Sequence, residues 1–359
     1  MAANISYLPN YPQEAGKNGK NHCGNYHYLT SFKAWITIMQ TIEKFLSCDW
    51  GTSNFRLRLI EACTISTLAE QTAPQGISAT YNLWQQSGQN RQGFYLDVIQ
   101  QHIKQLEEKL KVSLAGLPVV LSGMASSSIG MKELPYTSVP FFADGRDLNS
   151  ELIAPGDNFP HDLLIISGAK TGNDVMRGEE TQLAGIFYNT ANSVFVLPGT
   201  HSKHITVQDG KVTDITTYMT GEFFELLSKK SILAASLEDT GDINEPQNHN
   251  SFAEGIADSV TANLLHQCFM LRTNLLLNKT SKQQNYFYLS GLLLGTELKS
   301  LLQTMPPHIT LAASGKVQQY YQTAFDILLP PGHTTTLAVE NADDAVIKGQ
   351  LRILCEKKC

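Results

Sequence analysis

The sequence lacks any hydrophobic run that approaches the roughly 18 apolar residues needed to cross a membrane. Its first residues also lack the charged stretch and apolar core of a secretory signal. Positive charge is not in excess, because 27 Lys and Arg against 33 Asp and Glu give a net charge of −6 and an isoelectric point near 5.9. These absences argue against a membrane span and against a nucleic-acid or anionic-membrane partner, and they favour the cytoplasm.

The cysteines form no Cys-x-x-Cys pair and no framework of a disulfide-stapled domain. They are Cys23, Cys48, Cys63, Cys268, Cys355 and Cys359. Isolated thiols in a reducing cytoplasm are therefore expected. With 42% hydrophobic residues in 359, the chain can bury a full core and is long enough for two domains.

Residues 1–38 are polar, rich in Asn, Tyr and Gly, and poor in periodicity. We predict a disordered N-terminal extension that carries no chemistry. Met39 would be a natural first residue, so a start assigned too far upstream and a genuine flexible arm both remain open.

Residues 46–60 predict a strand, a tight turn and a second strand, because apolar side chains alternate on both sides of a run of turn formers. Gly51 lets the backbone turn and leaves room for a bulky anion. The candidate phosphate-binding residues of the turn are Gly51, Thr52, Ser53 and Asn54. Asp49 ends the first strand, a usual place for a carboxylate that holds a metal-bound phosphate. The alternative is an ordinary β-hairpin with a hydrophilic tip.

Residues 194–207 repeat this design of strand, Gly-Thr-x-Ser turn and strand. Two such hairpins about 150 residues apart suggest a duplicated domain whose two loops face each other. The candidate phosphate-binding residues of the second turn are Gly199, Thr200, His201, Ser202 and Lys203. A zinc site at His201 and His204 is disfavoured, because the His-x-x-His spacing lacks an accompanying Glu and falls on a turn.

Two further buried strands end in small or charged residues. Residues 117–130 change from branched apolar side chains to Ser, Gly and Ala, as sheets do where they bind ligands, although a plain strand-to-helix turn also explains them. Residues 163–168 lead into a Lys-Thr pair that is not a Walker A loop, because Leu164 and Ala169 stand where that loop needs glycines. The charges of 174–182 are then either a functional segment or a solvated helix cap.

The C-terminal part predicts further helices and one more strand that leads into a helix. Residues 218–227 predict a helix capped by Thr220, and a closing helix begins at Asp343. Residues 286–298 predict a strand that enters a helix through Gly291, where a flat ring could approach the backbone. The Gly-x-x-x-Gly spacing of Gly291 and Gly295 is also typical of close helix packing.

Four segments together resemble the 2-keto-3-deoxygalactonate kinases of the sugar-kinase, heat-shock-protein and actin superfamily. They are the Asp-x-Gly-Thr-Ser-Asn turn, the Ser-Gly-Met-x-x-Ser segment of 122–127, the Asp-Val-Met-Arg-Gly-Glu-Glu-Thr-Gln run of 174–182 and the Met-Thr-Gly-Glu run of 219–222. The resemblance covers Glu43 to Leu354. It implies an α/β fold of two ribonuclease-H-like, actin-like ATPase domains, each with a mixed five-stranded sheet flanked by helices. The substrate-side domain would span 43–188 and the nucleotide-side domain 189–359, with the active site in the cleft between them.

The resemblance also implies ATP and Mg²⁺ and assigns residue roles. In such kinases the base is an Asp that starts a helix ahead of the second phosphate loop, and Asp174 precedes Gly199 by 25 residues; Glu179 and Glu180 are the reserves. Asp49 would hold Mg²⁺ through water. The adenosine-binding residues would be Gly291, Leu292 and Gly295. The substrate-binding candidates are Asn54, Arg56, Ser122, Gly123, Met124, Ser126 and Arg177.

The expected activity is ATP-dependent phosphorylation of 2-keto-3-deoxygalactonate, with a small sugar acid and ATP as partners and a homo-oligomer left open. A kinase for another sugar or sugar acid is the second hypothesis, since Ser126–Ser128 and the approach through Asn173 depart from the family pattern. A non-catalytic sugar- or nucleotide-binding regulator is the third. Asp174 separates this regulator from a kinase of either kind, because a binding protein has no use for a proton acceptor there.

Overall fold

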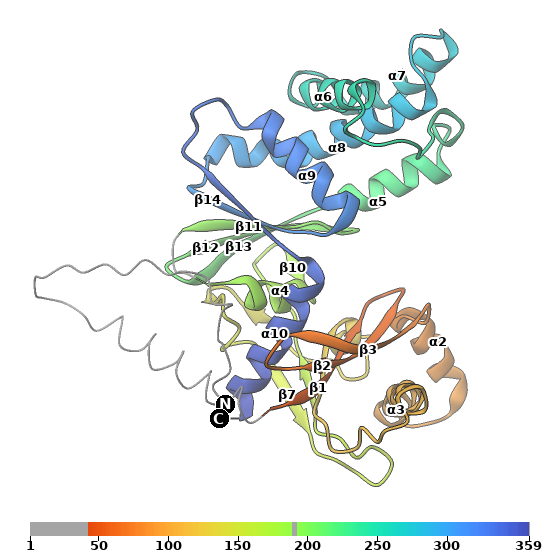
Figure 1. Cartoon of the computed structure of the whole chain (residues 1–359), viewed down its shortest axis with the longest axis vertical. Helices are drawn as coiled ribbons and strands as arrows, with labels where there is room; N and C mark the ends of the chain where they lie inside the picture. The colour runs from red at the N-terminus through yellow and green to blue at the C-terminus, as the bar shows by residue number, and fades with distance from the viewer. Residues whose placement is uncertain (1–41, 189–191, 359) are drawn as a thin grey trace, which may run out of the picture.

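The computed structural model describes residues 42–188 and 192–358, in two lobes stacked along the long axis of the molecule (Figure 1). The predicted N-terminal extension of 1–38 lies outside the described residues. Each lobe is built on a mixed sheet with helices against it, and the helices α4 and α10 lie between the two sheets. The fold is therefore the α/β fold that the sequence predicts.

The sheet of the lower lobe has the strand order β3-β2-β1-β4-β8-β7. Its strands are β1 Lys44–Trp50, β2 Phe55–Glu61, β3 Ser66–Ala73, β4 Val119–Gly123, β7 Ser150–Ile153 and β8 Leu163–Ile166. β1 runs antiparallel to β2 and parallel to β4, which is parallel to β8. The first predicted hairpin is thus confirmed, and Trp50 pairs with Phe55 at its turn.

The sheet of the upper lobe has the order β15-β14-β11-β12-β13-β6. Its strands are β6 Phe141–Phe142, β11 Ser193–Leu197, β12 Ser202–Gln208, β13 Lys211–Tyr218, β14 His308–Ala312 and β15 Thr336–Glu340. From β13 to β15 the order and strand directions repeat those from β3 to β8, which supports the duplication. A small third sheet joins β5 Thr137–Ser138, β9 Ala169–Lys170 and β10 Val175–Met176.

The expectation of five strands in each sheet is wrong, because each main sheet has six. β7 adds to the edge at β8, and β6 adds to the edge at β13, both antiparallel. These strands are four and two residues long, too short to give the alternation from which a strand is predicted.

The helices cover the sheets and form most of the upper lobe. They are α2 Ile77–Ser87, α3 Arg91–Leu110, α4 Glu179–Ile186, α5 Thr220–Glu225, α6 Pro246–Thr261, α7 Leu264–Leu276, α8 Lys282–Thr304, α9 Gly315–Leu328 and α10 Ala342–Lys358. The apolar face of α3 is buried against the lower sheet through Val98, Ile99, Ile103 and Leu106.

The strand expected at 286–289 is wrong, because these residues lie within the continuous helix α8. Ser281 and Gln284 form a capping box that starts the helix. A Cβ on Gly291 would lie 2.0 Å from the Phe252 carbonyl oxygen, and one on Gly295 would lie 2.2 Å from Ser259 Oγ. The two glycines therefore allow α6 to pack closely on α8, and the aromatic and apolar run is a buried helix rather than a strand.

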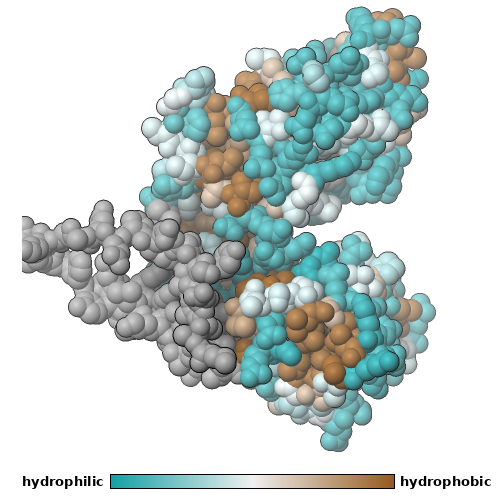
Figure 2. All heavy atoms as spheres, viewed as in Figure 1, coloured by the Kyte–Doolittle hydropathy of each residue, from teal (hydrophilic) through white to brown (hydrophobic). Residues whose placement is uncertain are grey.

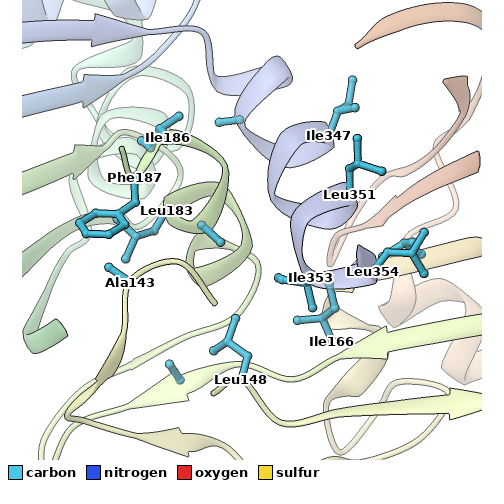
Figure 3. Close-up of a cluster of buried hydrophobic side chains, with 14 of the residues drawn as sticks. Ala143, Leu148, Ile166, Leu183, Ile186, Phe187, Ile347, Leu351, Ile353 and Leu354 are labelled. Carbon is cyan, nitrogen blue, oxygen red and sulfur yellow. The ribbon is translucent and has the colours of Figure 1, made fainter. Parts of the chain in front are cut away.

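The two lobes are joined where α4 crosses α10. A Cβ on Gly185 would lie 2.0 Å from the Ala345 carbonyl oxygen, and one on Gly349 would lie 1.8 Å from the Thr181 carbonyl oxygen. Around this crossing, apolar side chains of both helices and of both sheets form one buried cluster (Figure 3). Although α10 follows the upper sheet in sequence, Gln350 reaches the lower sheet and donates to the Cys48 carbonyl oxygen at 2.9 Å.

Candidate active site

The first glycine turn is held from behind by the start of α2. The amides of Gly76, Ile77 and Ser78 donate to the carbonyl oxygens of Ser53, Gly51 and Thr52, at 3.1, 3.0 and 3.2 Å. A Cβ on Gly76 would lie 2.2 Å from the Thr52 carbonyl oxygen, so only glycine allows this contact. Because the carbonyl groups point to the helix, the exposed amides of the turn are left for an anion.

The second turn is held in the same way by the start of α5. The Glu222 amide donates to the Thr200 carbonyl oxygen at 3.0 Å, and a Cβ on Gly221 would lie 2.4 Å from the Gly199 carbonyl oxygen. His201 Nε2 is 2.5 Å from Glu222 Oε2. Gly76 and Gly221 were not singled out from the sequence, and their position at the start of the helix after the third strand of each sheet is the signal that could have found them.

Asp49 lies where three segments of the lower lobe meet. A Cβ on Gly123 would lie 3.3 Å from Asp49 Oδ1, and φ of Gly123 is +87°, so this position requires glycine. Gly178 in turn faces Gly123, because a Cβ added to Gly178 would lie 3.5 Å from the Gly123 Cα. Burial raises the pKa of Asp49, and Arg56 and Arg58 partly oppose this shift. A cation beside this carboxylate would favour its charged form.

Glu179 links this carboxylate to the second turn. It is close enough to Asp49 to raise the pKa of that group, and its Oε1 is 3.6 Å from Lys203 Nζ. Lys203 is buried, so its charge is little screened by water. One partly exposed glutamate thus stands between the end of β1 and the second phosphate turn, which brings the candidate residues of the two hairpins into one site.

Asp174 does not start a helix as expected, because it precedes β10 and α4 begins only at Glu179. Its Oδ2 accepts a hydrogen bond from the Thr217 amide at 2.7 Å, and its Oδ1 accepts one from Thr217 Oγ1 at 2.5 Å. Thr217 pairs with Lys203 across β12 and β13. Asp174 therefore lies one strand away from Lys203 and ties the segment before α4 to the upper sheet.

Glu180, the other reserve, is buried at the start of α4. Both of its carboxyl oxygens are within 2.9 Å of the Gly178 amide, and Thr181 Oγ1 donates to Oε1 at 3.1 Å. Burial and the neighbouring Glu179 raise the pKa of Glu180 from 4.5 to about 7. A side chain that is 1% exposed and bonded to its own helix start has little access to a substrate.

Arg177 holds the small-residue loop after β4. Its Nη1 donates to the Ser126 carbonyl oxygen and to Ser126 Oγ, both at 2.6 Å, and its guanidinium lies 4.2 Å from the ring centre of Tyr136. Ser126 and Ser122 are buried, and Ser122 Oγ accepts a hydrogen bond from Gln350. Met124 is half-buried against the core of the lower lobe. Arg177 and Ser126 are therefore together, whereas Ser122 faces α10.

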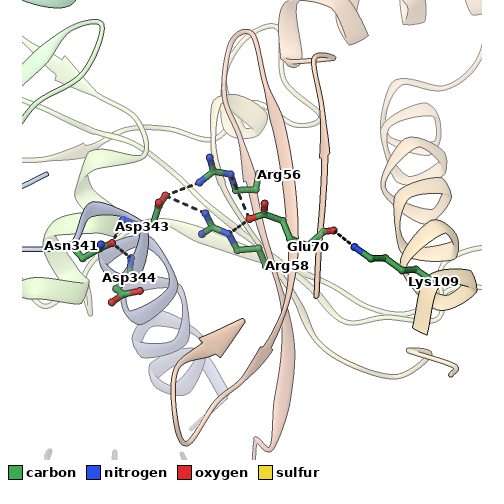
Figure 4. Close-up of polar contacts among 7 residues, drawn as sticks. All are labelled: Arg56, Arg58, Glu70, Lys109, Asn341, Asp343 and Asp344. Atoms are coloured by element: carbon green, nitrogen blue, oxygen red, sulfur yellow. Dashed lines mark hydrogen bonds and ion pairs between the residues drawn. The ribbon is translucent and has the colours of Figure 1, made fainter. Parts of the chain in front are cut away.

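Arg56 belongs to an ion cluster that joins the lower sheet to the start of α10 (Figure 4). Its Nη1 is 2.7 Å from Asp343 Oδ1, and Arg58 bonds both Asp343 and Glu70. Burial alone would raise the pKa of Asp343, but Arg56 and Arg58 hold it below its ordinary value. Asn54, the other candidate on this hairpin, is exposed.

A pocket of about 470 Å³ adjoins the second turn. It is lined by Pro198 and Gly199 of the turn, by residues of α5 and α8, and by the start of α9. From α8 the lining residues are Tyr286, Ser290, Leu293 and Leu294. Gly291 and Gly295 face α6 instead, and Leu292 is buried in another cluster. Figure 2 shows the lobes separated by a hollow on the side away from the grey residues.

Two absences hold for residues 42–188 and 192–358. No group of three or more His, Cys, Asp and Glu side chains is arranged to hold a metal ion there. None of the helices found in these ranges is both long and apolar enough to span a membrane.

The two sheets share the order of five strands, and each has a glycine turn packed on the start of a helix, which is the arrangement of an α/β protein with the actin-like ATPase fold. The chain belongs to the 2-keto-3-deoxy-galactonokinase family, whose profile matches residues 49–353. The predicted family and enzyme class, a phosphotransferase with an alcohol group as acceptor, are confirmed by this membership.

Individual relatives agree with this. The 2-dehydro-3-deoxygalactonokinase of Escherichia coli (strain K12) is 31% identical over 294 residues, which are 79% of this chain and 90% of the relative. The crystal structure of a candidate 2-dehydro-3-deoxygalactonokinase from Sinorhizobium meliloti superposes with a TM-score of 0.69 at 25% identity, and the match covers 85% of this chain and 94% of that chain.

Proposed function

We propose that the protein transfers the γ-phosphoryl group of ATP to 2-dehydro-3-deoxy-D-galactonate and forms the 6-phosphate, as a step of D-galactonate breakdown. The observation that carries the proposal is the family match over residues 49–353, which contain both glycine turns and Glu179 between them. In phosphoryl transfer the protein supplies position and charge rather than covalent chemistry, and both turns are built to do so.

The nucleotide would bind with its phosphates between the turns and its base in the adjoining pocket. The amides of Thr52–Asn54 and of the second turn would donate to phosphate oxygens, and Lys203 would add a positive charge. The pocket offers the aromatic side chains of Phe224, Tyr286 and Tyr320 for the base. Residues of α5, α8 and α9 other than the predicted Gly291, Leu292 and Gly295 would thus make the adenosine contacts.

The donor set near Asp49 fits a magnesium ion held mainly by ATP. Among the residues described, no cage of three carboxylates exists, and Mg²⁺ in kinases usually takes one or two carboxylates, phosphate oxygens and water. Asp49, whose pKa is raised by burial, would hold the ion through water. When bound, the ion would neutralise charge on the phosphates of ATP.

Asp174 is our first candidate for the base that takes the proton of the acceptor hydroxyl, and Glu179 is the second. Asp174 is partly exposed beside the partner strand of Lys203. Its three hydrogen bonds, two from Thr217 and one from the Val175 amide, orient the carboxylate. Glu179 keeps one oxygen close to Lys203.

The acid group of the substrate would be recognised by cationic and amide groups around the loop after β4. Arg177 is already oriented by Ser126 and Tyr136, and Asn54 is exposed on the first turn. Gly123 leaves space next to Asp49, and Met124 follows it. Ser122 and Arg56 would act indirectly, through Gln350 and Asp343.

A coupled ADP-release assay over a panel of sugars and sugar acids tests this proposal. We expect Mg²⁺-dependent turnover with 2-dehydro-3-deoxy-D-galactonate and at least about tenfold lower kcat/KM with other acceptors, or about 1.4 kcal/mol of discrimination. Preference for another acid would support a kinase of different specificity, and ATP binding without turnover on any acceptor would support the regulator. Either result would overturn the proposed function.

A further inference from the structure

A buried carboxylate lies beneath the second glycine turn. Glu297, on α8, is 2% exposed and lies within an apolar stretch of that helix. Its carboxylate is in contact with His204 Nε2 at 3.1 Å, with Tyr321 OH at 2.9 and 3.0 Å, and with Thr220 Oγ1. A carboxylate can only accept, so all three groups must donate to it.

The three donors come from three elements, two of which line the nucleotide pocket. His204 lies on β12, Thr220 starts α5 and Tyr321 lies on α9, and both Thr220 and Tyr321 line the pocket. Thr220 was predicted to cap α5, but the cap position is Met219 and the Thr220 hydroxyl points to Glu297 instead. Glu297 therefore ties together elements that are separate in sequence.

The network reaches the second turn through one more hydrogen bond. Ser202 Oγ is 3.0 Å from Tyr321 OH. Because the single Tyr321 proton is given to Glu297, Ser202 must be the donor in this bond. Ser202 and His204 are both buried and flank Lys203 on β12. The position of the turn thus depends on a chain from Glu297 through Tyr321 to Ser202.

We propose that Glu297 is a positioning residue that fixes the second phosphate turn and the inner wall of the nucleotide pocket. It touches neither reacting atom and acts through Ser202, Thr220 and Tyr321. The proposal rests on the proposed function only in taking Mg²⁺–ATP as the ligand of this pocket. Burying a carboxylate costs free energy unless its hydrogen bonds are all made. When all three donors bond to it, the carboxylate holds them in one geometry.

The substitution Glu297→Gln tests the proposal with almost no change in volume. A glutamine offers one oxygen and an NH2 group, so at least one of the three donors faces another donor and must move. We expect the Kd for Mg²⁺–ATP, measured by calorimetry, and the KM for ATP to rise about tenfold, which corresponds to about 1.4 kcal/mol. The KM for the sugar acid should stay within about twofold, and Glu254→Gln, at an exposed position on α6, should match the wild type.

Tyr321→Phe is the second variant, because it removes the hydroxyl that links Glu297 to Ser202 and keeps the ring. We expect it also to weaken Mg²⁺–ATP binding, and the double variant to lose less than the product of the two single losses. If Glu297→Gln does not fold, the Mg²⁺–ATP affinity of Tyr321→Phe alone tests the role of Glu297. Unchanged ATP affinity in a folded variant, or an equal rise in both KM values, would overturn the proposal.

The calorimetric readout separates this proposal from the proposed function. If the wild type binds Mg²⁺–ATP but phosphorylates none of the acceptors, and Glu297→Gln still weakens that binding, only the proposed function fails. If the wild type phosphorylates the sugar acid and Glu297→Gln binds ATP normally, only the role of Glu297 fails.

Discussion

At the scale of single residues, the choice of base between Asp174 and Glu179 can be decided by matched amide variants. Asp174→Asn keeps the shape of the side chain and one of its two acceptor oxygens, so that one of the two Thr217 hydrogen bonds can remain. We expect ATP affinity to be retained and kcat to fall by about 10²–10⁴. Steady-state kinetics with ATP and the sugar acid provide the measurement.

Glu179→Gln is the matched comparison for Asp174→Asn, since it keeps the contact with the Arg177 amide. If Asp174 is the base, Glu179→Gln should mainly raise the KM for ATP through the lost pairing with Lys203. A normal kcat in Asp174→Asn, with a collapsed kcat in Glu179→Gln, would transfer the role to Glu179.

A second residue-scale prediction concerns the pH dependence of stability at Glu180. Folding raises the pKa of this carboxyl from 4.5 to about 7, so the folded state binds the proton more tightly than the unfolded state. The contribution of Glu180 is therefore fully present below pH 4.5 and is lost as the pH rises to about 7. We expect Glu180→Gln to be more stable relative to wild type at pH 8 than at pH 5, by about 2–3 kcal/mol.

Urea unfolding of wild type and Glu180→Gln at pH 5 and pH 8 measures this difference, because other titrating groups are common to both proteins. If the unfolding free energies of wild type and Glu180→Gln differ by the same amount at pH 5 and at pH 8, Glu180 is not buried as a neutral acid.

The place of a single residue in the fold could be predicted from sequence wherever the signal is local. Asp49 and Gly51 stand out because a strand ends in a run of turn formers, and both lie where the pattern places them. Glu297 and Gln350 could not be found in this way, because their partners lie far away in sequence, as with Gln350 and Cys48. A lone glutamate in an apolar helix was the one available signal.

At the scale of elements, the crossing of α4 and α10 determines how the lobes are joined. Gly349→Ala places a methyl group 1.8 Å from the Thr181 carbonyl oxygen, so the helices must separate. We expect a loss of about 1–3 kcal/mol in the unfolding free energy. Chemical denaturation provides the measurement.

Gly156→Ala is the control for Gly349→Ala, because no atom lies within 4 Å of its Cβ position. Its unfolding free energy should stay close to that of the wild type. Equal stability of the two variants would mean that α4 and α10 are not in contact through Gly349.

The one wrong element shows the limit of local patterns. The run from Tyr286 to Gly295 has the apolar content of a buried strand and of a buried helix alike. Close contact of α6 with Gly291 and Gly295 fixes it as a helix, and this contact depends on tertiary packing. The Gly-x-x-x-Gly spacing therefore marks close packing of two helices, which was the alternative interpretation of this motif.

At the scale of the whole molecule, the repeated hairpins predicted a duplication, and five strands of each sheet share one order. The sequence did not indicate the short strands β6 and β7, nor that α10 returns to the lower lobe, because these depend on contacts between the halves. The ion cluster of Arg56, Arg58 and Asp343 is a further contact of this kind.

The central claim is that the two glycine turns hold one triphosphate between them. A crystal structure with Mg²⁺, a non-hydrolysable ATP analogue and the sugar acid measures this directly. We predict phosphate oxygens bonded to amides of both 52–54 and 199–203, with the base among Phe224, Tyr286 and Tyr320. Phosphates bound to one turn alone, or outside the cleft between the lobes, would contradict the account.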